Sequence, residues 1–372
     1  MNIIIFLIIL LVLVLVHEFG HFFSAKKFGI RVDEFGFGFP PKLYGRKYGE
    51  TEYSFNLFPI GGFVKIFGEN PDDENTNGPD RARSFVHKPK YQQAIVLFAG
   101  VFANFLLAWL LFSVGFMSGF PTSVGNAPAG QELKDVNLVI VSVLPDSPAE
   151  ASGLKTGDKI IFLSTENKKD LLKEVSAESM QSFIALHGRE EIEIGYVRGK
   201  SDGVDSYDSL DTIKVTPKNN DGKPMIGVSM DEIGIAKLPV LSAIKEGLWL
   251  TAFVAKGTFS GLYGLIADGL QGKGSLSTVT GPVGLVGIVG DAYDFGLVYL
   301  LSFTAIISVN LAIINLVPFP ALDGGRLFFL LIEKIKGSRI NPKITNTANA
   351  IGFGLLVLLM LVVTFKDVAR LF

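Results

Sequence analysis

The motif HEFGH at positions 17–21 contains the residues of this 372-residue chain best suited to chemistry. His17 and His21 are four residues apart, so on a helix they share one face and both imidazoles can bind a single Zn²⁺ ion. Glu18 is then placed to accept a proton from the water that such an ion activates. The spacing therefore predicts a hydrolytic zinc site.

The surroundings of this motif are apolar enough to be a membrane span. The run from Ile3 to about Ser24 reaches the ~20 residues that cross a hydrocarbon core of ~30 Å. An ionisable side chain at that depth costs at least ~2.5–3.5 kcal/mol, and metal coordination would offset this cost. A cleaved signal peptide is the alternative, but the start MNIII has no positive charge and no small-x-small cleavage site follows.

A catalytic zinc ion needs a third protein ligand and an open position. The chain has no cysteine, so the ligand must offer nitrogen or oxygen. His87 and His187 qualify by type, but His187 lies in a soluble block and His87 in a charged linker. We prefer Asp323 in NLVPFPALDGGRL (315–327), which follows an apolar run and would otherwise be isolated. The alternative is an ordinary helix-stop loop with a solvated aspartate.

Four apolar runs are long enough to span a membrane. With 48% hydrophobic and 19% charged residues, the chain is unusually apolar, and its net charge of −2 gives no sign of nucleic-acid binding. The predicted membrane core has a first half at 1–120 and a second half at 296–372. Its spans are expected at about 3–24, 94–120, 296–319 and 349–366.

The segment 238–270 is also long enough to span, but charged residues interrupt it. If it crossed, Asp323 would emerge on the side opposite to the histidines. We therefore expect 238–295 to be an amphipathic linker region at the outer interface.

The block at 121–237 is polar and reads as an α+β domain outside the membrane core. Its stretch SPAEASGLKTGDKII (147–161) resembles the strand–helix–turn–strand pattern of PDZ domains, and a helix at 176–188 would line a peptide groove. A generic β-sandwich is the alternative. Lys and Arg gather in 25–93 and 324–346, which places those segments in the cytoplasm and the PDZ-like domain outside.

The region 31–69 alternates apolar residues with polar residues or glycine and predicts a membrane-associated β-hairpin. Its strands could pair with an extended substrate peptide, with Gly36 and Gly38 as predicted substrate-binding positions. A purely structural cytoplasmic hairpin is the alternative.

The HEFGH motif and NLVPFPALDGG together resemble the site-2 protease family of intramembrane zinc metalloproteases, and within it the bacterial RseP-like branch that regulates sigma-E-type stress responses. The resemblance implies His17, His21 and Asp323 as zinc ligands, Glu18 as catalytic base, and Asn315 beside the scissile peptide. In the second span, AGVFANF keeps the family asparagine as Asn104, which we expect at the substrate site, but has valine at position 101 where the family usually has proline.

The resemblance also implies substrates and location. Its substrates would be single-span membrane proteins such as anti-sigma factors, cut in the bacterial cytoplasmic (inner) membrane by an active site toward the cytoplasm. Peptide C-termini would bind the PDZ-like domain, and one such domain fits where better-known members have two. The fold expected is a polytopic α-helical membrane protein with about four transmembrane helices, the hairpin and the inserted domain.

Two other functions fit parts of the sequence. A non-catalytic membrane receptor or scaffold would bind peptides at its PDZ-like domain and hold a structural zinc ion, but such an ion usually has four protein ligands. A metal transporter would need polar residues along more than one span, and the first and last spans offer no such path.

Overall fold

The computed structural model describes residues 1–70, 77–128, 130–165, 170–198, 210–220, 223–272 and 281–369. These residues form two compact units. The helical unit comprises Met1–Ser113, Ile244–Tyr293 and Leu300–Phe372, and the sheet unit comprises Val114–Ala243 and Asp294–Tyr299.

Five helices are long and apolar enough to cross a membrane: α1 (Asn2–Lys27), α3 (Lys90–Ser118), α6 (Val240–Leu270), α8 (Leu297–Leu316) and α10 (Pro342–Ala369). They fit the expected polytopic membrane protein. α6 differs from the others, because the mean hydropathy of its most apolar window is 1.2, against 2.3–2.9 for the other four. Only 6% of that window is buried.

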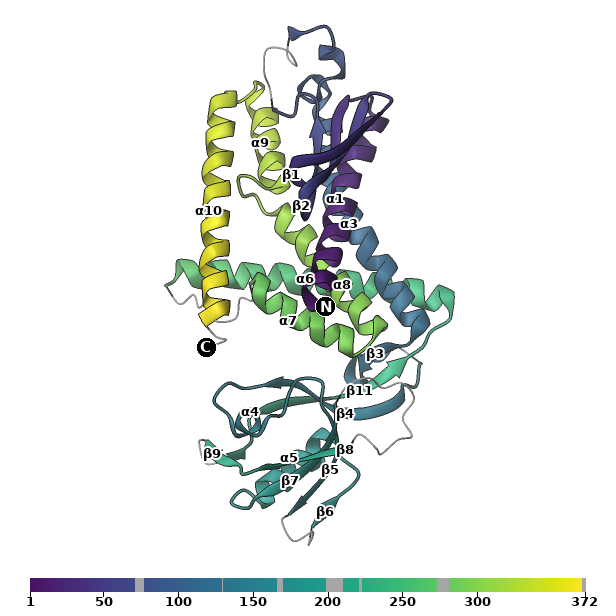
Figure 1. The fold of residues 1–372 in the computed structure, drawn as a ribbon, viewed down its shortest axis with the longest axis vertical. Coiled ribbons are helices and arrows are strands. Elements are labelled where there is room, and N and C mark those ends of the chain that lie inside the picture. The colour runs from purple at the N-terminus through teal and green to yellow at the C-terminus, as the bar shows by residue number, and fades with distance from the viewer. Residues whose placement is uncertain are drawn as a thin grey trace. The chain divides into compact units, whose positions relative to one another are not determined.

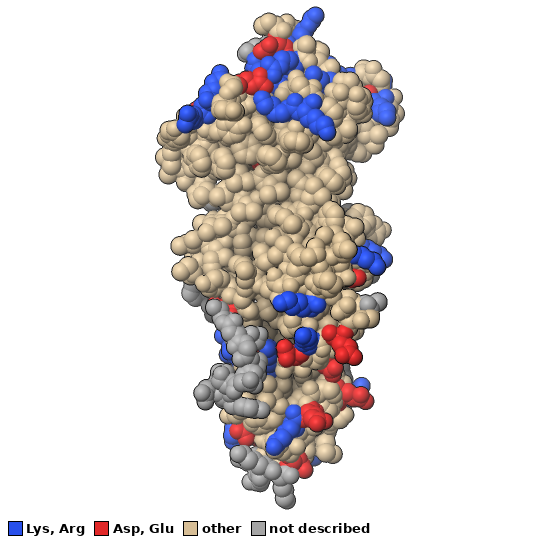
Figure 2. Space-filling model, turned by 90° about the vertical axis from the view of Figure 1, so that its right-hand side faces the viewer, with Lys and Arg blue, Asp and Glu red and all other residues tan. Residues whose placement is uncertain are grey.

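Within the helical unit, α1, α3 and α10 run in roughly the same direction, whereas α6 runs across them (Figure 1). Lys and Arg side chains gather at the end of the unit that carries the turn of the hairpin, and a broad belt below it shows almost no charge (Figure 2). This belt is the surface expected of a segment that lies in hydrocarbon.

The predicted hairpin region forms β1 (Val32–Tyr48) and β2 (Thr51–Ile66), joined at Gly49, whose φ of 62° favours glycine. In β1, residues 34–37 pair with residues 62–65 on one side and with residues 52–55 on the other, both from β2. Residues 62–66 are therefore an outer strand of this small sheet, next to α1, and their other edge is unpaired within it.

Two helices of the helical unit were not expected from the sequence. α7 (Pro282–Asp294) lies inside the predicted linker region, and α9 (Asp323–Lys336) begins at the predicted zinc ligand. α9 mixes apolar and charged residues, so a search for apolar runs passes over it. It ends at Gly337 in the left-handed conformation that commonly closes a helix.

The sheet unit is built on one sheet with the strand order β3-β11-β4-β5-β7-β8, with β6 paired to β5. β9 pairs with β10 separately. The strands are β3 (Phe120–Ser123), β4 (Lys134–Val143), β5 (Lys159–Thr165), β6 (Leu171–Leu172), β7 (Ile192–Val197), β8 (Leu210–Val215), β9 (Lys218–Asn220), β10 (Lys223–Met225) and β11 (Val228–Ala236). Short 3₁₀ turns lie at Val124–Asn126 in this unit and at Arg81–Arg83 and Phe85–His87 in the helical unit.

Two helices pack on this sheet, and their caps explain where they begin. In α4 (Pro148–Ser152), the Ser147 side chain accepts a hydrogen bond from the backbone N–H of Glu150. In α5 (Ala177–Leu186), Ser176 and Ser179 form a reciprocal capping box. Met180 and Ile184 of α5 enter the apolar core with Ile140, Leu163 and Ile194 of the sheet. The block is thus a sheet-rich domain, and its PDZ-like character stays a prediction.

Candidate metal centre

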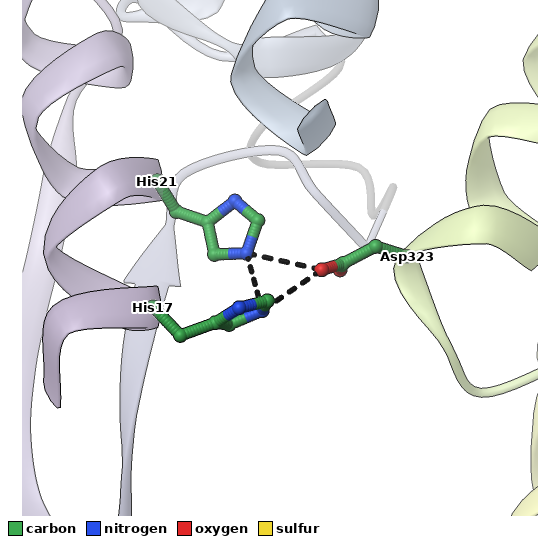
Figure 3. A group of neighbouring side chains, drawn as sticks. All are labelled: His17, His21 and Asp323. Carbon is green, nitrogen blue, oxygen red and sulfur yellow. Dashed lines mark hydrogen bonds and ion pairs between the residues drawn. The ribbon is translucent and has the colours of Figure 1, made fainter. Parts of the chain in front are cut away.

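His17 and His21 lie one turn apart on α1 and both rings point to the same place (Figure 3). Each residue is 7% exposed, and their Nε2 atoms are 3.2 Å apart. The helix thus presents two buried nitrogen ligands on one face, as the spacing predicts.

Asp323 reaches these rings from the first residue of α9, 302 positions beyond His21 in the chain (323 − 21). Its Oδ2 lies 2.9 Å from His17 Nε2 and 3.2 Å from His21 Nε2. Ligand atoms ~2.0–2.1 Å from a tetrahedral zinc ion are about 3.3 Å from one another, so the three atoms are spaced as one ion requires. Three ligands leave a fourth position open.

The outer nitrogens of both rings have partners that suit metal binding through Nε2. His21 Nδ1 donates to the carbonyl oxygen of Val96 at 2.8 Å, which leaves Nε2 without a proton. Asn104 Nδ2 lies 3.4 Å from His17 Nδ1, while Asn104 Oδ1 is buried without a hydrogen-bond partner among the described residues. A turn of this amide brings Oδ1 to a protonated Nδ1 and satisfies both atoms. The residues present therefore fit a zinc ion.

Glycines let α3 approach the metal site closely. A Cβ atom on Gly100 would lie 2.3 Å from His21 Nε2, and one on Gly20 would lie 2.2 Å from the carbonyl oxygen of Ala99. α1 and α3 thus cross with almost no side chain between them. Val101, next to this crossing, is fully buried, and α3 continues through it as a helix.

The segment 317–322 between α8 and α9 holds Asp323 in place through backbone contacts. Ala321 has a φ of 76°, and its N–H donates to Asn349 Oδ1 of α10 at 3.1 Å. Gly324 and Gly325 pack directly on this segment: a Cβ atom on Gly325 would meet the Phe319 carbonyl oxygen at 2.1 Å. The double glycine after Asp323 is therefore required by close packing.

A cavity of about 380 Å³ opens onto the three ligands. Glu18 and Asn315 line it, so the predicted base and the predicted substrate contact share one space with the metal site. Phe63 and Val64 of β2 line it as well. The outer strand 62–66 of the hairpin therefore stands at the wall of this cavity.

Other residues considered from the sequence lie elsewhere. Asn104 is fully buried behind His17 and does not line the cavity. Gly36 and Gly38 do not line it either; a Cβ atom on Gly36 would lie 2.4 Å from the ring of Phe63, which does.

The two remaining histidines do not belong to the ligand group. His87 is exposed in a 3₁₀ turn, and the ring of His187 contacts Asp170 and Glu190 in the sheet unit. Among the described residues, the one cluster with metal-ligand geometry is His17, His21 and Asp323.

Sequence reasoning missed Gly100, Asn349 and Arg326, the last of which also lines the cavity. Arg326 had a weak signal, as a charged residue three positions after Asp323. Gly100 stands in the AGVFANF stretch but was not singled out, and Asn349 had no signal, because only the packing of separate helices brings it to the site.

Comparison with known proteins agrees with this geometry. The model of peptidase family M50 matches residues 5–359. A Clostridium perfringens protein named as a zinc metalloprotease is 36% identical, over 96% of this chain and 95% of its own. The zinc metalloprotease RasP of Geobacillus kaustophilus is 30% identical over 100% and 98% of the two chains. The regulator of sigma E protease of Haemophilus influenzae is 28% identical over 98% of each.

Proposed function

We propose that His17, His21 and Asp323 hold the zinc ion of this chain, which belongs to peptidase family M50, and that Glu18 is its catalytic base. Membership of the family, with relatives named as zinc metalloproteases, makes the chain an intramembrane zinc metalloprotease. The scaffold and transporter alternatives are therefore not retained. The convergence of the three ligand atoms supports the assignment of the ligands.

The chain's own groups account for the proton transfers of peptide hydrolysis. When bound, zinc supplies Lewis acidity that activates water and polarises a carbonyl group. Glu18 takes a proton from the attacking water and returns it to the leaving amine as the C–N bond breaks. Asn315, on the same cavity, offers an amide that can hold the substrate backbone.

The outer strand 62–66 is suited to present the substrate. A helix hides its peptide bonds, so a transmembrane substrate must be extended before it is cut. The unpaired edge of 62–66 can add such a segment by β-augmentation, next to Glu18. Gly36 and Gly38 would contribute through the shape of the sheet, since a Cβ atom on Gly38 would lie 2.5 Å from the Phe58 carbonyl oxygen.

Cleavage of a single-span model substrate in detergent tests the assignment, with zinc content measured for each variant. Glu18→Gln should keep zinc and lose at least about 10²-fold in rate, because only the base is removed. Asp323→Ala should lose both zinc and activity. Turnover by Glu18→Gln, or full zinc content in Asp323→Ala, would show that these roles are misassigned.

For partners, we propose peptides with free C-termini at the sheet unit and single-span proteins such as anti-sigma factors at the active site. A groove of about 450 Å³ lies between α5 and the start of β11, lined by Gln181, Met225, Val228 and Met230. β11 pairs with β4 on one side, and with β3 only from Ile233 onward. Among the described residues no strand pairs with this side of its first half, which could therefore accept a peptide beside the apolar groove.

Peptide binding can be measured on the full chain with labelled peptides ending in apolar residues. Gln181→Trp should fill the groove and weaken binding at least tenfold. The matched control Ser182→Trp, one position along α5 and outside the groove, should bind normally. Equal binding by both variants, or equal binding of amidated peptides, would contradict a PDZ-like mode.

For topology, we propose four spans, α1, α3, α8 and α10, in the bacterial cytoplasmic membrane, with the active site toward the cytoplasm and the sheet unit outside. α6 would lie at the outer interface. Its low hydropathy, its exposure and its direction across the other helices support this (Figure 1).

A further inference from the structure

Arg326 lies on the first turn of α9, three residues after Asp323, so both side chains project from the same face. It lines the metal cavity together with Glu18 and Asn315. The cavity therefore contains a guanidinium group to which the proposed hydrolysis assigns no role.

Glu69 holds this guanidinium in place. Arg326 Nη1 donates to Glu69 Oε1, and the two side chains are 31% and 17% exposed. A second cavity of about 200 Å³ lies beside the first, and the residues the two cavities share are Glu69 and Arg326. The Arg326–Glu69 pair thus forms the wall between the two cavities. There the Glu69 carboxylate compensates the charge of the guanidinium and lowers the cost of removing it from water.

Most of the hydrogen-bonding capacity of Arg326 is unused. A guanidinium has five N–H donors in a fixed plane, and among the described residues its side chain donates to Glu69 alone. Arg326 is therefore pre-oriented, charged and able to donate further hydrogen bonds into the cavity.

We propose that Arg326 donates hydrogen bonds to the carbonyl oxygen of the scissile peptide and stabilises the negative charge that develops there. As water adds to the carbonyl carbon, the carbonyl electron pair moves to that oxygen, and it returns when the C–N bond breaks. Glu18 carries the proton from water to the amine, and Arg326 stays protonated throughout. Donors fixed before reaction are effective because they need no reorganisation.

This inference rests on the proposed catalytic roles of Glu18 and the three ligands, so its test begins with those variants. With a cleaving wild type and an inactive Glu18→Gln as references, Arg326→Gln should keep full zinc content and lower kcat about 10²–10³-fold, with little change in KM. Full zinc content in Arg326→Gln would show that the rate fell because the donor was lost, and reduced zinc content would show that the metal site was lost. Active Glu18→Gln would refute the proposed function, whereas fully active Arg326→Gln would refute only this inference.

Two further measurements distinguish an Arg326 that contacts the substrate from an Arg326 that only pairs with Glu69 and supports the structure. Arg326→Ala should regain part of its kcat when guanidinium ion is added, because the ion can occupy the emptied volume. Glu69→Gln should lower kcat less than Arg326→Gln, since it removes the orienting partner and leaves the donors. Arg83→Gln, which breaks the Arg83–Glu50 pair away from both cavities, is the matched control and should stay active.

If Arg326 only pairs with Glu69 and supports the structure, the activities of these variants will differ from those expected above. Equal losses in Glu69→Gln and Arg326→Gln, no added loss in the double variant and no rescue by guanidinium would overturn the proposal. So would a rise in KM alone, which indicates a ground-state contact, or loss of zinc from Arg326→Gln.

Discussion

The amide of Asn104 decides which nitrogen of His17 is free for a metal. With Asn104 Oδ1 toward the ring, Nδ1 keeps its proton and Nε2 is a ligand. Asn104→Leu keeps the volume of this buried side chain but removes the acceptor. We expect its zinc affinity, measured by competition with a chelator, to fall about 10–100-fold, as is typical when the partner of a metal-binding histidine is lost.

Asn104→Asp is the matched control, because its carboxylate still accepts from Nδ1–H. It should hold zinc far better than Asn104→Leu. Equal affinities in the wild type and Asn104→Leu would mean that Asn104 only fills space beside His17.

At the residue scale, sequence reasoning reached the ligand group but not its support. His17, Glu18 and His21 follow from the spacing on one helix, and Asp323 from a carboxylate after an apolar run. Asn104 was found only through the family resemblance, which suggested a substrate contact rather than its position behind His17. Asn349 could not be found, because its contact with the Ala321 backbone depends on how α10 packs.

At the element scale, the crossing of α1 and α3 fixes the two imidazoles. Gly100→Ala would place a methyl group 2.3 Å from His21 Nε2, so the ring or the helix must move. Helix propensity alone favours alanine over glycine by about 1 kcal/mol, so any loss must come from this collision. We expect Gly100→Ala to lose most of its zinc and its proteolytic activity.

Gly354→Ala on α10 is the control for this substitution, since its added Cβ meets nothing within 4 Å. It should keep zinc and activity, with equal or higher thermal stability. Zinc content in Gly100→Ala equal to that of Gly354→Ala would show that the helices can separate without cost.

The elements themselves were predictable where one residue class dominates. The apolar runs indicated α1, α3, α8 and α10, and alternation indicated the hairpin region. α9 was missed because it is amphipathic and follows two prolines. The double pairing of residues 34–37 was also missed, because strand register depends on contacts between segments that sequence alternation does not specify.

At the scale of the whole molecule, the metal site constrains the number of spans. His17 lies in α1 and Asp323 follows α8, and their side chains meet at 2.9 Å, so both must reach the same depth. We infer that α1 and α8 run in the same direction through the bilayer, which requires an odd number of crossings counted from α1 to α8 inclusive. In the proposed topology α3 is the one crossing between them, and α6 would then not be another.

Single cysteines can test this arrangement, because the natural chain has none and gives no background labelling. Lys245→Cys and Asp268→Cys place exposed thiols near the two ends of α6. We expect a membrane-impermeant reagent to label both from the same, outer side of intact cells, together with Glu178→Cys in the sheet unit. Arg46→Cys and Arg339→Cys should react only after the membrane is opened, because basic segments stay in the cytoplasm.

The two α6 positions decide between the topologies because they lie 23 residues apart (268 − 245). At 1.5 Å per residue this is about 35 Å, enough to cross the ~30 Å hydrocarbon core. A spanning α6 would therefore label at one end only, and Asp323 would have to reach His17 from the opposite side of the membrane. Labelling of Lys245→Cys and Asp268→Cys from opposite sides would contradict the four-span arrangement. The zinc ligands are tested separately, by the zinc content of the variants.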